Sequence, residues 1–254
     1  SLNYVIDILH GFYSKYKERS DEMGLAGPFE EKKRQMLRYE VIARFCQYAE
    51  SLGAFIYGYR TNHLARDKES KVLSAIGRYR VKDISDEFRI LTKGQINQLW
   101  KKQKQLLEDI FGYYKISAPK FLNSKHDSLY NIKKLLKEVY DCYSFYQDSY
   151  NSYKHGYRLW FGRDQKNHDV VIYIPTIRYN RKRRDYVPSD DETLDVVMRC
   201  MRNCRQLFDI LIENERQMRI ARNKNCKIKI SFLKKRNNEF AIDKQTYNQK
   251  VNQH

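Results

Sequence analysis

Glycine and proline are scarce in this sequence, with 10 Gly and 4 Pro in 254 residues. That scarcity excludes collagen-like and low-complexity chains, and it does not suit an all-β fold, which needs many turns. No apolar run approaches the ~20 residues that span a bilayer, so we expect no membrane partner and no integral membrane segment. The five cysteines are odd in number and scattered, and nothing near Ser1 resembles a signal peptide. These features predict a reducing, cytoplasmic compartment rather than a disulfide scaffold.

Motifs for several common chemistries are also missing. The chain has neither of the glycine-rich phosphate loops, GxxxxGK[ST] and GxGxxG, and it has no GxSxG or HExxH. Cys200 and Cys204 lie four residues apart, but no second pair or nearby His completes a zinc site. Two small apolar residues on the core face of a helix are the preferred interpretation. We therefore expect no metal and no cofactor.

What the sequence does contain is apolar residues at three- and four-residue spacing, which predicts amphipathic helices. Helices are expected at 2–20, 29–59, 62–77, 83–91 and 94–112. A loop at 113–123 follows, after which Ser124 or Asp127 can cap a long helix that ends near Lys154. Ser189, with Glu192 at the capping-box position, predicts the start of the last helix.

Two stretches with β-type patterns, 168–174 and 226–232, are expected to pair with each other. The predicted fold class is mainly α: a multi-helix bundle with a small two-stranded antiparallel β appendage near the C-terminus. We expect residues 1–233 to form a single helical domain. Residues 234–254 are expected to be a basic polar tail without regular structure.

The charge is strongly positive, with 49 Lys and Arg against 31 Asp and Glu, a formal net charge of +18. Half of the excess positive charge lies between Arg216 and the end of the chain, a stretch with 11 basic residues and two acids. A second cluster is expected in a loop before Pro188, flanked by Tyr179 and Tyr186 as stacking surfaces. Its basic members are Arg178, Arg181, Lys182, Arg183 and Arg184. RNA or another polyanion is the expected partner of these clusters, and a solvated surface is the alternative for the tail.

The end of the long helix carries two contrasting faces. One face, within an arc of about 140°, is made of tyrosines and is expected to pack into the bundle: Tyr140, Tyr143, Tyr146, Tyr150 and Tyr153. The opposite face is a seam of polar residues at heptad spacing: Asp141, Ser144, Asp148, Asn151 and His155. Periodicity alone allows this seam to be the solvated side of the helix. Its short hydrogen-bonding side chains, in place of long Lys and Glu, favour a functional site.

The seam ends at a titratable His155 that follows Asn151 and Lys154 and precedes Arg158. A histidine can act as acid or base near neutral pH, and the two cations can hold a phosphate. The pattern Asn-x-x-Lys-His-Gly at the end of a long helix resembles the HEPN superfamily. More closely, it resembles uncharacterised bacterial HEPN-like proteins that carry Lys-His-Gly in this context, followed by a short strand.

The family's motif is an Arg, a polar residue, and a His four to six residues after the Arg. This sequence departs from it, since no Arg lies four to six residues before His155. Asn151 occupies the nearest comparable helix position, and Lys154 is adjacent to the His. A literal match occurs from Arg163 to His168, but it is expected between Gly162 and a strand rather than on a helix. We interpret that match as a coincidence.

The resemblance implies an RNA-directed protein and leaves open whether it is an enzyme. Many members are metal-independent endoribonucleases of toxin–antitoxin or antiviral defence systems, and their catalytic residues pair across a dimer. For an enzyme, it implies His155 as general base, Lys154 and Arg158 as phosphate stabilisers, and Asn151 as an orienting hydrogen-bonder. The alternative is a non-catalytic helical module for protein interaction or dimerisation. A homodimer is expected in either case, and a protein such as an antitoxin is the other partner considered.

Overall fold

The structure is a computed structural model of the 254-residue chain. It describes residues 2–23, 28–62, 74, 76–78, 81–92, 99–114, 116–154, 159–166, 168–173, 185–220, 226–237 and 239–249. The chain divides into two compact units: unit 1 comprises residues 1–49 and 141–202, and unit 2 comprises residues 50–140 and 203–254. No described helix is both long enough and apolar enough to cross a membrane.

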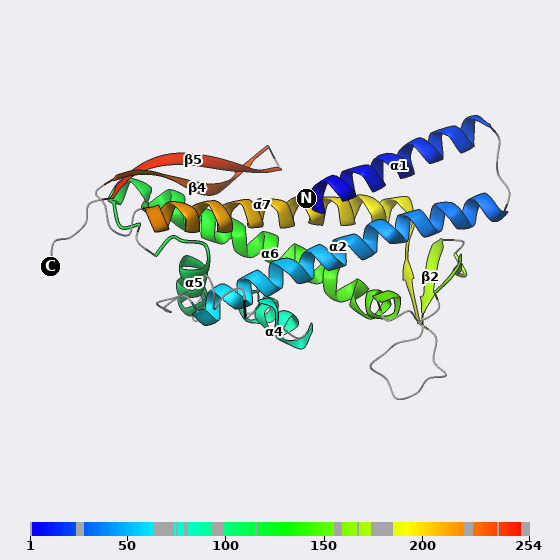
Figure 1. The fold of residues 1–254 in the computed structure, drawn as a ribbon, viewed down its shortest axis with the longest axis horizontal. Coiled ribbons are helices and arrows are strands. Elements are labelled where there is room, and N and C mark those ends of the chain that lie inside the picture. Colours follow the sequence, from blue (N-terminus) through cyan, green and yellow to red (C-terminus); the bar gives the residue numbers. More distant parts are fainter. Residues whose placement is uncertain are drawn as a thin grey trace. The chain divides into compact units, whose positions relative to one another are not determined.

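Helices dominate both units, which confirms the mainly α class (Figure 1). They are α1 (Leu2–Glu22), α2 (Pro28–Asn62), α4 (Val81–Thr92), α5 (Leu99–Ile110), α6 (Pro119–Lys154) and α7 (Asp191–Ile220). Helices α2, α6 and α7 contribute residues to both units. The helix expected at 62–77 falls mostly outside the described residues, as does 93–98, the expected start of α5.

Two predicted helix caps are wrong, that of α6 by several residues and that of α7 by one. Helix α6 begins at Pro119, within the stretch expected to be a loop. Proline suits the first turn of a helix because its missing N–H would have no partner there. Helix α7 is capped by Asp190, whose Oδ1 accepts the Thr193 N–H at 2.8 Å. Ser189 instead has its N–H and carbonyl in bonds to Asp169 and Arg38, so its backbone ties the helix start to the sheet of unit 1.

That sheet is antiparallel, with the order β1 (Trp160–Arg163), β2 (Asp169–Tyr173) and β3 (Asp185–Pro188). The expected strand near 168–174 is confirmed as β2, but the expected pairing with 226–232 is wrong. Both edges of β2 are occupied, by β1 and by β3. No edge of β2 therefore remains for a distant strand.

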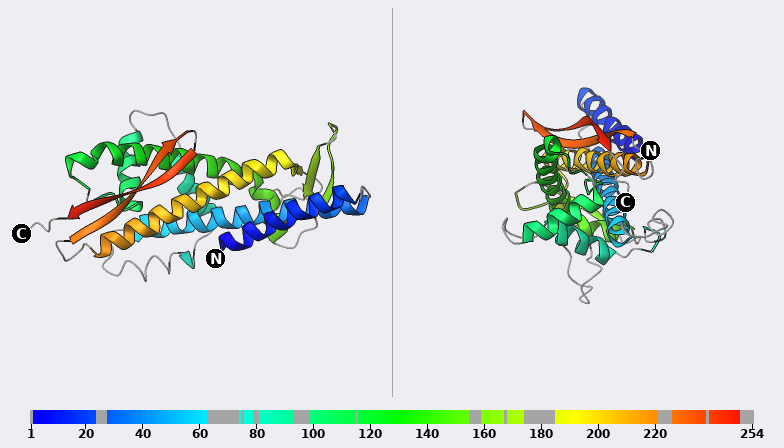
Figure 2. Two further views of the ribbon diagram at one scale, coloured as in Figure 1. Left: turned by 90° about the horizontal axis from the view of Figure 1, so that it is seen from above. Right: turned by 90° about the vertical axis from the view of Figure 1, so that its left-hand side faces the viewer.

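The second sheet belongs to unit 2 and is a hairpin of β4 (Cys226–Arg236) and β5 (Glu239–Gln249). The expectation that 234–254 lacks regular structure is therefore wrong for most of that stretch. Asn237, at the turn, has φ 45°, a conformation that two-residue hairpin turns favour and asparagine tolerates. A strand joined by such a short turn pairs at a small entropic cost, which explains why β4 pairs with β5. The two strands cross in the view from above, so the hairpin is strongly twisted (Figure 2).

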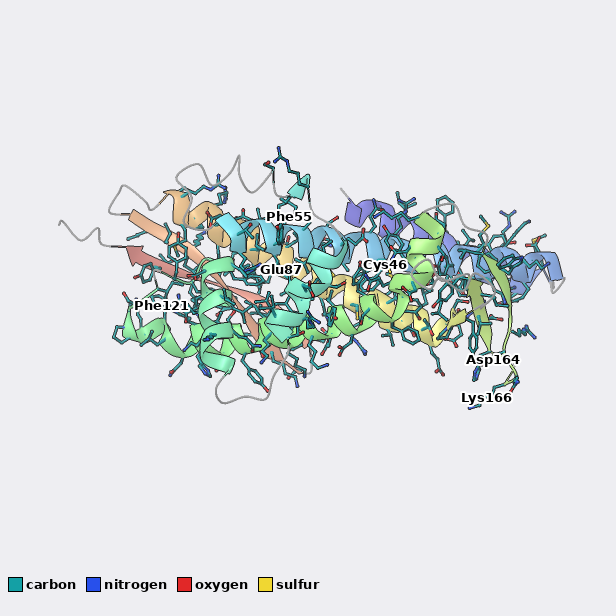
Figure 3. The ribbon with its side chains drawn as sticks, turned by 90° about the horizontal axis from the view of Figure 1, so that it is seen from below. Cys46, Phe55, Glu87, Phe121, Asp164 and Lys166 are labelled. Carbon is teal, nitrogen blue, oxygen red and sulfur yellow. The ribbon has the colours of Figure 1, made fainter. Side chains whose placement is uncertain are left out.

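Each unit has its own apolar core. In unit 1 the fully buried side chains include Tyr39, Phe45 and Tyr143. In unit 2, Gly53 of α2 allows close packing on α4, since a Cβ there would collide with Ile84 and Phe88. Among the side chains labelled in Figure 3, Phe55 stands in an edge contact with Phe208, and Phe121 stacks on Phe232.

The outer edge of β4 is closed by side chains of the helices rather than by a strand. Asn214 of α7 accepts the Ser231 N–H at 2.8 Å and donates to the Ser231 carbonyl at 3.0 Å. Ser128 of α6 accepts the Leu233 N–H at 2.8 Å. Tyr113, which is fully buried, donates to the Ser231 carbonyl at 2.6 Å. The peptide groups of β4 therefore stay satisfied although the strand is buried.

We expect Asn214→Ala to lower the free energy of unfolding by about 2–4 kcal/mol, because it leaves the buried Ser231 N–H without an acceptor and removes a donor from the Ser231 and Phe111 carbonyls. Asn131→Ala is the matched control, since it removes one half-buried bond to the Leu233 carbonyl. We expect it to cost about 1 kcal/mol. Urea denaturation measures both changes. Equal losses in the two variants would contradict the role of Asn214.

Candidate functional site

The structure describes two of the four expected catalytic residues. Asn151 is 7% exposed, and its Oδ1 has no hydrogen-bond partner among the described residues. Lys154 is exposed at the last position of α6, with Nζ 5.7 Å from the centre of the Tyr150 ring. His155 and Arg158 lie outside the described residues, so their placement beside Asn151 and Lys154 stays a prediction.

The two faces of α6 are only partly as expected. On the tyrosine face, Tyr143, Tyr146 and Tyr150 are buried. Tyr153 is 38% exposed and donates to Glu40 at 2.6 Å. The polar seam changes along its length: its first members, Asp141 and Ser144, are exposed, Asp148 is half-buried, and Asn151 is buried. A solvated helix face does not account for the end of the seam, because an amide with an unpartnered oxygen is buried there.

The basic loop residues Arg178, Arg181, Lys182, Arg183 and Arg184 also lie outside the described residues. Tyr186, proposed as a flanking stacking surface, is 60% exposed on β3. Its exposure is consistent with stacking.

Arg163 and His168 belong to the hairpin between β1 and β2, with no helix beneath them. Asp164 organises the turn by accepting the N–H groups of Lys166 and His168 at 2.8 and 2.9 Å. Figure 3 labels Asp164 and Lys166 at this turn. The bonds from these two N–H groups lower the pKa of Asp164. Arg163 thus ends β1 and His168 precedes β2, so the expectation that this match does not lie on a helix is confirmed.

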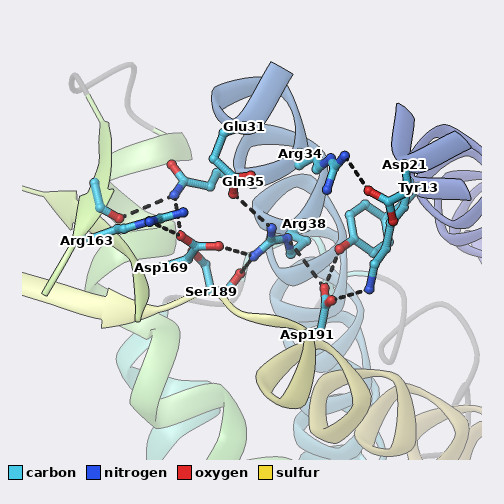
Figure 4. Close-up of polar contacts among 12 residues, drawn as sticks. Tyr13, Asp21, Glu31, Arg34, Gln35, Arg38, Arg163, Asp169, Ser189 and Asp191 are labelled. Atoms are coloured by element: carbon cyan, nitrogen blue, oxygen red, sulfur yellow. Dashed lines mark hydrogen bonds and ion pairs between the residues drawn. The ribbon is translucent and has the colours of Figure 1, made fainter. Parts of the chain in front are cut away.

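Sequence reasoning missed a polar network around Arg38 in unit 1 (Figure 4). Arg38 of α2 is only 5% exposed. Its Nη1 donates to Asp169 of β2 at 2.6 Å and to the Ser189 carbonyl at 3.0 Å. Its Nε lies 3.6 Å from Asp191 at the start of α7. One guanidinium thus joins a helix, a sheet and a second helix start.

The carboxylates of this network are stabilised in their charged forms. Burial would raise the pKa of Asp169, but hydrogen bonds from Arg38 and Gln35 outweigh it and lower that pKa. Asp191 behaves in the same way: burial is outweighed by bonds from Lys17 and Tyr13, and its pKa is lowered. Burial and the bond to Asp191 raise the pKa of the Tyr13 hydroxyl. Because the charges of this network are paired with one another, a structural role is favoured. Its residues lie far apart in the sequence, so no local pattern predicted it.

Most of the excess charge lies in unit 2. Its sequence contains 30 Lys and Arg against 15 Asp and Glu, a net charge of +15, whereas unit 1 contains 19 against 16, a net charge of +3. The two units are similar in size, so the difference is one of charge density. Polyanion binding is therefore expected chiefly of unit 2.

One face of α6 in unit 2 combines exposed cations with an exposed aromatic ring. At 100° per residue its members fall within an arc of about 120°. All are exposed: Lys120, Asn123, His126, Asp127, Tyr130, Lys134 and Lys137. Tyr130 is 53% exposed, and Lys134 lies 5.9 Å from the Phe240 ring of β5. We call these seven residues the basic face of α6.

A groove of about 450 Å³ lies between α7 and the hairpin of unit 2. Its lining residues are Asp209, Ile212, Glu213, Ser231, Ile242 and Lys244. Burial raises the pKa of Asp209, although Arg205 and Lys244 oppose the shift. Hydrogen bonds from Arg216 and Gln217 lower the pKa of Glu213. Ser231 Oγ is buried and has no hydrogen-bond partner within the described chain.

No group of three or more His, Cys, Asp and Glu side chains in the described part of the chain is arranged to hold a metal ion. Comparison of the chain with protein-family models, with curated proteins and with solved structures found no match in any of the three. The resemblance to the HEPN superfamily therefore stays a prediction that rests on residues 151–158.

The lowered pKa values of Asp169 and Asp191 predict the pH dependence of stability. A carboxylate whose folded pKa lies below its unfolded value of about 3.9 stabilises the fold above that value. Its contribution is lost as pH falls through the folded pKa. We expect Asp169→Asn to destabilise the protein at neutral pH and to reduce the loss of stability on acidification. Asp21→Asn, which removes an exposed ion pair with Arg34, should change the unfolding curves little. Identical acid profiles for wild type and Asp169→Asn would contradict this account.

Proposed function

We propose that the protein binds RNA through the basic face of α6. The observation that carries the proposal is the coincidence of exposed lysines and an exposed tyrosine on one helix face of the unit that holds most of the net charge. Lysines attract the phosphate backbone, and a tyrosine ring stacks on an unpaired base. Single-stranded RNA offers both groups, whereas a duplex keeps its bases stacked inside.

Different residues of this face would contact the phosphates and the bases. Lys120, Lys134 and Lys137 lie along the face, and Tyr130 lies between Lys120 and Lys134 in sequence. Lys134 also contacts the Phe240 ring, which keeps its ammonium near the hairpin. The hairpin adds exposed cations at Lys227, Lys229 and Lys235. The proposed surface therefore combines α6 with neighbouring strands of the same unit.

We expect Lys134→Ala/Lys137→Ala to weaken binding of a labelled oligouridylate and to reduce the slope of log affinity against log salt by about 1.4, or ~0.7 per lost phosphate contact. Tyr130→Ala should weaken binding by about 1–3 kcal/mol with little change in that slope. Fluorescence anisotropy across a salt series measures both effects.

The matched control is Lys15→Ala/Lys32→Ala, which removes two exposed lysines from unit 1. An equal loss of affinity in both double variants would show that only total charge matters. Absence of wild-type binding at about 50 mM salt would refute RNA binding by this face.

A catalytic version of the proposal is supported by Asn151. Its buried Oδ1 lacks a described partner, and it lies one helical turn before Lys154, the first of the two cations that flank His155. Such an acceptor can orient a donor of a reacting group, and Lys154 can stabilise charge on a phosphate. In this version His155 is the general base of a metal-independent endoribonuclease. The alternative is a non-catalytic module that binds RNA or a protein without cleaving it.

We expect the catalytic version to cleave total RNA in the presence of EDTA and His155→Ala to abolish the cleavage. His168→Ala, which removes an exposed histidine outside the basic face of α6, is the control and should cleave normally. Gel analysis of the RNA over time gives the answer. Intact RNA with the wild type, or equal cleavage by wild type and His155→Ala, would leave the non-catalytic module as the better account.

A further inference from the structure

The two edges of the β4–β5 hairpin differ in the hydrogen bonding of their peptide groups. The N–H groups of Lys229, Ser231 and Leu233 point away from β5, because each bonds to a helix side chain: Gln217, Asn214 and Ser128. The Ser231 and Leu233 carbonyls also accept bonds from helix side chains and Tyr113. The outer edge of β4 is thus closed.

The register shows which groups point outward from β5. Lys229, Ser231 and Leu233 pair with Thr246, Lys244 and Ile242 respectively. In an antiparallel ladder, opposed residues either both bond across the pair or both point away from it. The peptide groups of Ile242, Lys244 and Thr246 therefore point outward from β5.

These outward groups have no hydrogen-bond partner in the described ranges. Near the turn, the Phe240 carbonyl accepts a bond from Gln206 of α7 at 2.6 Å. Beyond it, Lys244 and Thr246 are exposed and Ile242 is half-buried. An open edge of this kind can accept an added strand.

The groove lies beside this edge and suits the side chains of an added strand. Ile242 and Lys244, two of the outward-pointing residues, line it together with Ile212, which is 49% exposed. Ser231 Oγ supplies a buried hydroxyl that lacks a partner. In an added strand, an apolar side chain would pack against Ile212 and Ile242, and a neighbouring polar side chain would bond Ser231 Oγ.

The positive charge of the hairpin indicates which kind of segment would bind at this edge. Residues 226–249 contain six Lys and Arg against two acids. The groove carboxylates already face cations, with Glu213 3.1 Å from Arg216 and Asp209 4.0 Å from Arg205. A second copy would bring two units of +15 together, which repulsion opposes. We propose that β5 binds an extended acidic segment of a partner protein, which pairs with the outward groups of Ile242, Lys244 and Thr246 as a third strand.

The test uses the full chain and a labelled, capped peptide of about ten residues that alternates Val and Glu. Hydrogen exchange followed by NMR is the primary readout. Without peptide, the amides of Ile242, Lys244 and Thr246 should exchange faster than those of Ala241, Asp243 and Gln245, which face β4. Peptide should slow exchange at the first three amides. Unchanged exchange at these three, or no binding at about 1 mM peptide, would overturn the proposal.

Two controls isolate backbone pairing from charge. A peptide with N-methylated amides keeps every side chain but loses its donors, so it should bind at least about tenfold more weakly to the wild-type protein. Thr246→Pro removes one outward N–H and should weaken binding, whereas Thr246→Ala should not. Equal binding of the methylated peptide overturns the proposal and does not depend on how any variant folds.

A final arm separates this surface from RNA binding. Oligouridylate should leave exchange at Ile242, Lys244 and Thr246 unchanged. If it protects these amides as the peptide should, the occupant is nucleic acid and the peptide proposal is overturned. Lys134→Ala/Lys137→Ala should keep peptide protection, so failure of the RNA proposal and failure of this one give different results.

Discussion

The hairpin of unit 2 depends on one constraint: a buried strand edge cannot leave its peptide groups without hydrogen bonds. Strand β4 meets this constraint with side chains from two helices, chiefly Asn214 and Ser128. Because each of these side chains bonds one particular peptide group, together they determine the register of β4 on the helices. The register of β5 then follows from a two-residue turn. The open edge of β5 and the groove beside it are consequences of that arrangement.

Unit 1 contains a buried charge that likewise needs partners. Arg38 is almost fully buried, and its guanidinium is matched by Asp169 and Asp191 and by a backbone carbonyl. A buried charge is tolerable only when it is paired and hydrogen-bonded in this way. The acids of the network are paired with cations of the same unit. Unit 2 holds almost as many acids, 15 against 16, but 30 Lys and Arg against 19 in unit 1.

The proposed binding and the candidate chemistry belong to different units. RNA binding is assigned to a helix face of unit 2, and strand addition to an edge of the same unit, so both rest on its positive charge. The candidate chemistry at Asn151 and Lys154 belongs to unit 1, where charge is balanced. Binding and cleavage are therefore separate hypotheses that different residues support.

The sequence by itself predicted the mainly α class and most helices, because an apolar stripe with a period near 3.6 is a local signal. It also predicted β2 from a run of β-favouring residues and β4 from its alternation. It missed β5, although Asn237-Asn238 between two alternating runs was a usable signal for a hairpin. It placed the start of α6 too late because Pro119 was taken as a helix breaker.

Only the tertiary structure decided the pairing of the strands, the Arg38 network and the contrast between the two edges of the hairpin. Each depends on residues far apart in the chain: Arg38 is separated from Asp169 by 131 positions, and Ser128 from Leu233 by 105. Burial of Asn151 likewise reversed the expectation for a polar helix face. Periodicity assigns a residue to a side of its helix, but what packs against that side is determined by the rest of the chain.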